Sequence, residues 1–93
     1  MFSWDARKAL GNLAKHGVSF DEAATVFADP DALDFDDVEH SEAEIRSVRI
    51  GFSFGGRILF VVYTVRRLRH EKETIRIISA RQATRKERRA YAG

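Results

Sequence analysis

The chain has 93 residues, a length that supports one hydrophobic core, so we expect a single domain over residues 1–93. Its hydrophobic fraction of 44% and charged fraction of 32% are those of a globular protein and exclude extended disorder. The absence of cysteine excludes disulfides, cysteine zinc sites and thiol nucleophiles. No apolar run approaches the roughly 18 residues that span a bilayer, and the first residues lack the order of a signal peptide, so we expect a cytoplasmic protein without membrane contact.

The net charge of +2 conceals two halves of opposite sign. Residues 1–44 hold three basic and eleven acidic residues, a charge of −8, whereas residues 45–93 hold thirteen basic and three acidic residues, a charge of +10. Such an asymmetry predicts a basic surface that meets an anion such as nucleic acid. The acidic stretch 29–44 is expected to form a solvated edge, and the alternative is that it shields an RNA site.

Two short helices are predicted at the start of the chain. The first begins after Asp5 and ends near His16, where Gly17 supplies the left-handed conformation that commonly terminates a helix. Ser19 and Glu22 form a capping box that opens a second helix, which ends before the single proline. The apolar faces of these helices require a sheet to cover them.

Four strands are predicted in the rest of the chain. Along residues 46–53, Val48, Ile50 and Phe52 alternate with polar residues and glycine, which indicates a strand with one buried face. The run ILFVVYTV, residues 58–65, is typical of a central strand buried on both faces. Adjacent glycines between these two segments indicate a hairpin turn, and a polar loop follows over 66–73. The expected strands are 32–36, whose acids suit an exposed edge, 46–53, 58–65 and 74–79.

A last helix is predicted after these strands. The segment TRKE, residues 84–87, is a capping box and opens a helix that runs through about Tyr91. The order of the elements predicts the α+β class, with two N-terminal helices, a four-stranded and mainly antiparallel sheet, and a C-terminal helix. The phenylalanines expected in the core are Phe20, Phe27, Phe52 and Phe60.

Basic residues gather after residue 65, in the loop, on the last strand and on the last helix. Arginine presents a planar fork of donors that matches phosphate, so several forks around one site can hold a scissile phosphodiester. We expect Arg76 and Arg81 to serve a site or a buried partner, and an antiparallel hairpin would bring Arg66 close to Arg76. For the helix, the alternative is an ordinary solvated charged face. The basic set is Arg66, Arg67, Arg69, Lys72, Arg76, Arg81, Arg85, Lys86, Arg88 and Arg89.

Lys15, His16 and Gly17 form a second candidate group. Helix termination alone can explain all three, because the helix dipole favours a cation in the last turn and glycine suits the C-cap. The functional alternative uses His16 to transfer a proton, since histidine has a reference pKa of roughly 6.5, and Lys15 to contact phosphate. The three histidines are far apart and the acids lack the spacing of a calcium loop, so neither a metal site nor a cofactor is expected.

Two motifs in order, KHGVSF-x-EA and RIISAR-x-A-x-x-x-E, carry a resemblance that extends almost from end to end of the chain. With these motifs the chain resembles the BrnT toxins, a branch of the RelE-like ribonuclease toxins of type II toxin–antitoxin systems. The resemblance implies a RelE-like antiparallel sheet and a metal-independent ribonuclease that arrests translation. It also implies neutralisation by a small BrnA-like antitoxin with a ribbon-helix-helix domain, through which the complex binds operator DNA.

The resemblance further implies a set of site residues. Arg66, Arg76 and Arg81 are expected to hold the phosphate and stabilise the transition state, while His16 or Lys15 assists proton transfer from the ribose 2′-hydroxyl. The other positions that match the family pattern are Glu44, Arg46, Glu87 and Tyr91. The expected RNA contacts are Arg46, Arg67, Arg69, Arg85 and Tyr91.

Two functions of different classes remain open at this point. The first is an RNA-cleaving toxin, which the clustered arginines and the resemblance favour. The second is a catalytically inactive module with the same fold that acts as a co-repressor in an antitoxin–DNA complex. An autonomous DNA-binding protein is disfavoured because no helix-turn-helix or ribbon-helix-helix pattern is present.

Overall fold

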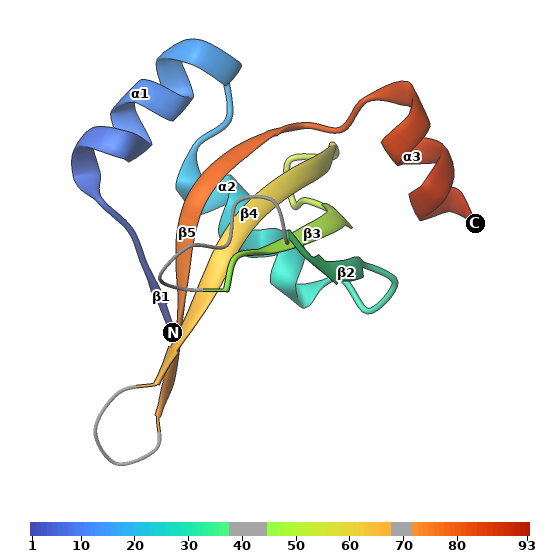
Figure 1. Ribbon diagram of the computed structural model, residues 1–93. Coiled ribbons are helices and arrows are strands. Elements are labelled where there is room, and N and C mark those ends of the chain that lie inside the picture. The colour runs from blue at the N-terminus through green and yellow to red at the C-terminus, as the bar shows by residue number, and fades with distance from the viewer. Residues whose placement is uncertain (38–44, 68–71) are drawn as a thin grey trace.

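The structure, a computed structural model, describes residues 1–37, 45–67 and 72–93 and contains one five-stranded sheet with the order β1-β5-β4-β3-β2 (Figure 1). Strands β2 to β5 pair antiparallel, so the α+β class and the order of the four main strands are confirmed. Among the described residues, no helix is long and apolar enough to cross a membrane. The elements are β1 (Phe2–Ser3), α1 (Ala6–His16), α2 (Phe20–Thr25), the 3-10 helix η1 (Val26–Ala28), β2 (Leu33–Asp36), β3 (Ser47–Phe52), β4 (Ile58–Arg67), β5 (Glu73–Gln82) and α3 (Arg85–Ala92).

Strand β1 is an addition to the four expected strands. It runs parallel to β5, with Phe2 opposite Ile75 and Ser3 opposite Arg76. The amide of Ile75 donates to the carbonyl of Met1 at 2.9 Å. Two residues are too few for a strand periodicity to show in a sequence. The sheet is therefore mixed, and its parallel pair lies at the N-terminal edge.

Strands β4 and β5 form a hairpin that is longer than expected. Each strand has ten residues. Arg66, Arg67 and Glu73, which fall in the predicted loop over 66–73, therefore belong to the paired strands. Residues 68–71 lie outside the described part of the chain. A register shift between Val62 and Tyr63 marks a β-bulge, since Val62 pairs with Ser79 and Tyr63 pairs with Ile77. The bulge changes which side chains of β5 share a face with those of β4.

The two faces of β4 differ in burial, which corrects the expectation of a strand buried on both faces. Leu59 and Val61 belong to the core beneath α2, whereas Phe60 and Val62 are half-buried on the other face. Phe52, expected in the core, lies at the end of β3 and is 50% exposed. The buried core consists of Val18, Phe20, Ala23, Val26, Leu59, Val61, Ile77 and Ala80.

Each helix begins at its predicted capping residue, but α2 ends earlier than expected, at Thr25, and the 3-10 helix η1 continues to Ala28. Asp5 caps α1, with Oδ1 3.0 Å from the amide nitrogen of Lys8, and the helix ends at Gly17, which has a φ of 68°. The hydroxyl of Ser19 accepts the amide of Glu22 at 3.0 Å and caps α2, but the expected capping box is only half formed, because the carboxylate of Glu22 binds Arg57 and Ser53. The bonds that begin α1 and α2 thus form between residues only three positions apart and do not depend on contacts with the sheet.

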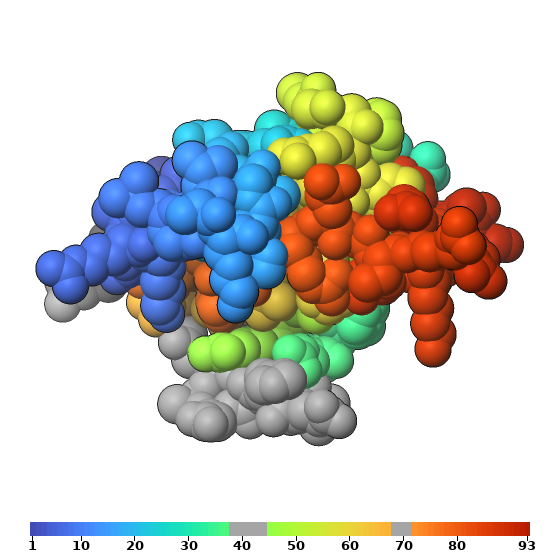
Figure 2. Space-filling model, turned by 90° about the horizontal axis from the view of Figure 1, so that it is seen from above, coloured from blue at the N-terminus to red at the C-terminus, as the bar shows by residue number. Residues whose placement is uncertain are grey.

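Helix α1 lies beside the edge of β5, and Asn12 joins the two. Its side chain is 8% exposed and donates to the carbonyls of Val18 at 2.9 Å and Ala80 at 2.8 Å. The side-chain oxygen of Asn12, Oδ1, also accepts a hydrogen bond from the backbone amide of Ala80 at 3.0 Å. The amide side chain thus takes the place of a neighbouring strand and satisfies buried backbone groups. Seen from above, α1 and α3 lie at opposite ends of the molecule with β5 between them (Figure 2).

Candidate active site

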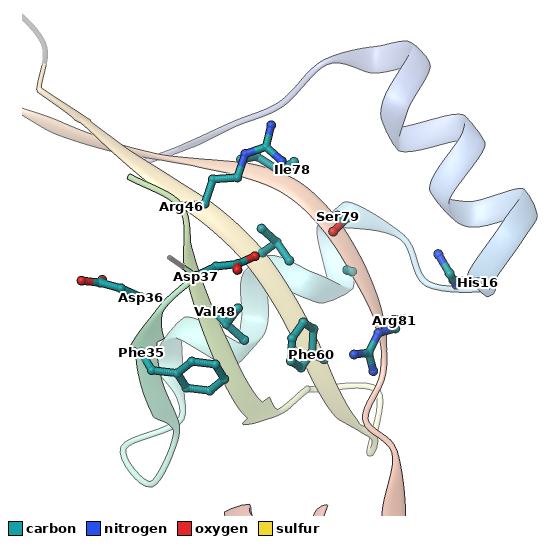
Figure 3. A pocket seen from close by; sticks show the side chains of 12 residues that line it. His16, Phe35, Asp36, Asp37, Arg46, Val48, Phe60, Ile78, Ser79 and Arg81 are labelled. Carbon is teal, nitrogen blue, oxygen red and sulfur yellow. The ribbon is translucent and has the colours of Figure 1, made fainter. Parts of the chain in front are cut away.

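A groove of about 520 Å³ lies on the face of the sheet that the core helices leave open. Strands β3, β4 and β5 form its floor, and the end of α1 and the residues around the end of β2 form its rim (Figure 3). Apolar, cationic and acidic side chains all line it. They are His16, Phe35, Asp36, Asp37, Arg46, Val48, Phe60, Val62, Ile78, Ser79, Ala80 and Arg81.

The register of β4 and β5 stacks Arg81 on Phe60. The two residues are cross-strand partners, so their side chains project from the same face. The guanidinium carbon of Arg81 lies 4.0 Å from the centroid of the Phe60 ring, which is a cation–π contact. Because Phe60 belongs to a central strand, this stack holds the guanidinium over a rigid floor.

Glu87 holds the same guanidinium from the side of α3. Nη1 and Nη2 of Arg81 donate to Oε1 and Oε2 of Glu87 at 2.7 and 3.0 Å. Glu87 also completes a capping box with Thr84, whose amide donates to Oε1 at 2.8 Å. The bonds from Arg81, and then that from Thr84, hold the pKa of the Glu87 carboxyl below its usual value. The carboxylate is therefore charged at neutral pH.

His16, the last residue of α1, lines the same groove as Arg81. Figure 3 shows the imidazole and the guanidinium on the same side of the groove. The bonds between Asn12 and Ala80 fix α1 against β5 one residue before Arg81. The structure thus brings together two of the predicted residues, one that can move a proton and one that can hold a phosphate.

The other side of the groove carries an arginine, two carboxylates and an aromatic ring. Arg46 lies just before β3, and its carbonyl accepts the amide of Asp37 at 2.7 Å. Phe35 is 47% exposed, and the centroid of its ring lies 6.5 Å from that of the Phe60 ring. Nucleic-acid bases stack on aromatic rings of this kind.

Arg66 and Arg76 project from the same face of the hairpin as Arg81 but are remote from it. Thr64 pairs with Arg76 and Arg66 pairs with Thr74, so the two arginines are diagonal neighbours, as expected. Arg81 lies five residues beyond Arg76, which is roughly 15 Å along the strand. Neither Arg66 nor Arg76 is among the described residues that line the groove.

Tyr91 has a partner on the body of the protein. Its hydroxyl donates to Oδ2 of Asp29 at 2.6 Å, and Asp29 also accepts the amide of Phe52 at 2.8 Å. The bond to Asp29 raises the pKa of Tyr91 to about 12. The tyrosine thus ties the end of α3 to the turn after η1 and lies outside the lining of the groove.

The other predicted residues are on the surface or outside the described ranges. Lys15 and Arg85 are exposed, and Arg67 is exposed beside Glu73, at an N–O distance of 3.4 Å. Arg69 and Glu44 lie outside the described residues. Within residues 1–37, 45–67 and 72–93, no three histidine, aspartate or glutamate side chains are placed to hold a metal ion.

Phe60 and Phe35 are groove residues that sequence patterns do not reveal. Phe60 lies in an apolar run that is typical of the core, and its face depends on the register of the strand. A pairing of Phe60 with Arg81 would follow from the hairpin only if the bulge after Val62 were known. Phe35 alternates with aspartates along β2, but four residues do not indicate which face of the strand packs on the core.

Two comparisons with known proteins agree on one family. The sequence profile of the family described as "Ribonuclease toxin, BrnT, of type II toxin-antitoxin system" matches residues 4–87. The 1.1 Å crystal structure of the Brucella abortus ribonuclease toxin BrnT is similar to this chain, with a TM-score of 0.63 and 26% sequence identity over 91% of this chain and 99% of that one. No curated protein sequence matches the chain. The chain therefore belongs to the BrnT family of ribonuclease toxins of type II toxin–antitoxin systems.

Proposed function

We propose that this chain is an endoribonuclease that cleaves RNA without a metal ion, in the groove that His16 and Arg81 line. The observation that carries the proposal is the meeting of an imidazole and a stacked guanidinium in one groove. Membership of the BrnT family supports RNA as the substrate. RNA contributes its own nucleophile, the ribose 2′-hydroxyl, so the protein has to position the phosphate, stabilise charge and move protons.

In the proposed reaction the 2′-oxygen attacks the adjacent phosphorus, and the 5′-oxygen of the next nucleotide leaves. His16 accepts the proton of the 2′-hydroxyl, and a proton from the imidazolium or from water goes to the 5′-oxygen. The products are a 2′,3′-cyclic phosphate and a 5′-hydroxyl. Arg81 donates to the non-bridging oxygens, whose negative charge grows in the pentacoordinate transition state. His16 is favoured over Lys15 because only His16 is among the described residues that line the groove.

The RNA is proposed to follow the open face of the sheet away from Arg81. Phe35 and Phe60 supply aromatic surface for a base, and Arg46 lies across the groove. Arg76, roughly 15 Å from Arg81 by strand rise, and Arg66, roughly 20 Å from it, suit phosphates beyond the scissile one. Their proposed role is thus to bind the backbone of the RNA and not to stabilise the transition state.

We further propose that cleavage inhibits translation and that a small ribbon-helix-helix antitoxin of the BrnA type neutralises the enzyme. The same antitoxin would carry the complex to operator DNA. The support for these three statements is the membership of the chain in a type II toxin–antitoxin family.

The test is cleavage of a defined RNA by purified protein in EDTA. We expect the wild type to cut and to leave a 2′,3′-cyclic phosphate end, and we expect Arg81→Ala to cut roughly 100-fold more slowly. Arg7→Ala removes the same charge from an exposed position on α1 and serves as the matched control. Cutting that requires Mg²⁺, or an Arg81→Ala variant as fast as the wild type, would contradict the proposal. A folded wild type that cuts no RNA, with or without ribosomes, would instead support the inactive co-repressor.

A further inference from the structure

The hydrogen bonds of Arg81 leave one edge of its guanidinium open. Of its five N–H groups, those on Nη1 donate to Oε1 of Glu87 at 2.7 Å and to the carbonyl of Gln82 at 3.3 Å. One N–H of Nη2 donates to Oε2 of Glu87 at 3.0 Å. Glu87 thus occupies the end of the guanidinium, between Nη1 and Nη2. In the described part of the chain, no acceptor is bonded to Nε or to the second hydrogen of Nη2.

These two remaining N–H groups form a second fork, along the side edge of the guanidinium. A fork of this geometry binds two oxygens of a phosphate as well as it binds a carboxylate. The Arg81 side chain is 34% exposed and lines the groove, so a ligand can reach it. The stack on Phe60 at 4.0 Å covers one flat face and restricts how the guanidinium turns.

We propose that Glu87 is a positioning residue, which holds the end fork of Arg81 so that the side fork is presented to the scissile phosphate. The inference rests on the proposed function, because the phosphate in question is that of RNA. The carboxylate of Glu87 is itself held by the backbone amide of Thr84, which donates to Oε1 at 2.8 Å and does not depend on the Thr84 side chain, so the orientation passes from the start of α3 to the guanidinium. Glu87 acts through Arg81 and does not contact the substrate.

The opposite role for Glu87 is that of a competitor, whose carboxylate keeps phosphate away from Arg81. A competitor must leave before the phosphate binds, so its removal would raise both affinity and rate. The geometry favours positioning, because the side fork is open while Glu87 is bound. Positioning predicts that loss of the carboxylate lowers kcat, while KM stays the same or falls because a negative charge near the phosphate is gone.

Two matched variants separate positioning from helix capping. Glu87→Gln keeps the capping box, which accepts glutamine at this position, but puts an amide nitrogen where Arg81 needs an acceptor. Thr84→Ala removes the capping hydroxyl and leaves Glu87 beside Arg81. We expect kcat for RNA cleavage to fall about tenfold or more in Glu87→Gln, since small misplacements of this kind are costly. Thr84→Ala and the surface control Glu73→Gln should cleave at close to the wild-type rate.

A second measurement needs no cleavage. In ¹⁵N-labelled protein titrated with inorganic phosphate, the Nε–H resonance of Arg81 should shift to saturation in the wild type and shift less in Glu87→Gln. A wild type that cuts no RNA but shows this Glu87-dependent shift would retain the positioning role and lose only the proposed reaction. The inference is overturned if kcat rises in Glu87→Gln, if Thr84→Ala slows cleavage as much as Glu87→Gln, or if phosphate moves the Nε–H resonance equally in wild type and Glu87→Gln.

Discussion

Arg57 and Arg81 each hold a glutamate through two nitrogens, but they use different edges of the guanidinium. Arg57 uses its side fork, with Nε 3.0 Å and Nη2 2.5 Å from the two carboxylate oxygens of Glu22. Arg81 uses its end fork on Glu87 and keeps the side fork open. Both arginines therefore join two elements, but only Arg81 keeps its side fork available to a ligand.

The pair of Arg57 and Glu22 joins the β3–β4 hairpin to the helical corner. Nη2 of Arg57 also donates to the carbonyl of Gly17 at 3.1 Å, and the hydroxyl of Ser53 donates to Glu22 at 2.7 Å. The hairpin turn passes close to this pair, because a Cβ at Gly55 would lie 2.6 Å from a carboxylate oxygen of Glu22. The contacts around Arg57 are thus internal and structural, whereas Arg81 faces the groove.

The largest expected effect that tests this comparison is on activity, in Arg81→Lys. Lysine keeps the charge but has neither fork, so we expect RNA cleavage to fall roughly 100-fold. The free energy of unfolding should change by about 1 kcal/mol or less, because the pair with Glu87 is partly exposed. Single-turnover cleavage and urea unfolding of the same preparation measure the two quantities. A loss of stability that accounts for the loss of cleavage would make Arg81 a structural residue like Arg57.

The next effect is on stability, in Arg57→Ala. We expect the free energy of unfolding to fall by about 2 kcal/mol, because the change leaves the partly buried carboxylate of Glu22 without its charged donor. Urea unfolding monitored by the single tryptophan measures this. Cleavage at a temperature where the variant is folded should match the wild type. An unchanged unfolding midpoint would show that the hairpin is held by its apolar contacts alone.

The third effect is a pH dependence of stability that Glu22 contributes. The bonds from Arg57 lower the pKa of Glu22 from the ordinary value of 4.5. A lowered pKa means that the carboxylate stabilises the folded state above pH 4.5 and that this contribution is lost as the pH falls through the folded-state pKa. We expect the difference in unfolding free energy between wild type and Glu22→Gln to shrink on acidification from pH 6 towards pH 3. A difference that is constant over this range would show that Glu22 does not contribute to the loss of stability in acid.

Helix caps could be predicted from the sequence, whereas the pairing of the strands could not. Caps at Asp5, Ser19 and Thr84 depend on residues three positions apart, and all three are found where expected. Strand β1 and the bulge after Val62 depend on pairing with distant residues, so no local pattern indicates them. Local chemistry is therefore predictable, and register is not.

The same distinction applies to the site. His16 and Arg81 are predictable as chemical groups, and the structure adds that they share a groove. The role of Phe60 beneath Arg81 requires the register of β4 against β5, and the open side fork of Arg81 requires the placement of Glu87. Arg66 and Arg76 are also predictable as groups that suit phosphate, but the structure places them along the strands, away from Arg81.

The smallest expected effect is at the far end of α3, in Tyr91→Phe. Helix α3 buries no residue completely, so polar contacts hold it: the pair of Arg81 and Glu87 near its start and the bond from Tyr91 to Asp29 near its end. Loss of the hydroxyl should lower the free energy of unfolding only slightly, since the contact lies at the surface.

The sharper measurement for Tyr91→Phe is hydrogen exchange. The amide of Arg88, which donates to the carbonyl of Thr84 at 2.9 Å, should exchange faster, while amides of β5 keep their protection. The bond raises the pKa of Tyr91 to about 12, so its contribution is present at neutral pH and is lost only as the pH rises from about 10 through that value. Cleavage should fall less than in Glu87→Gln, because Glu87 and its bonds to Arg81 remain. If Tyr91→Phe slowed cleavage as much as Glu87→Gln, the placement of the whole helix, and not the carboxylate of Glu87, would orient Arg81.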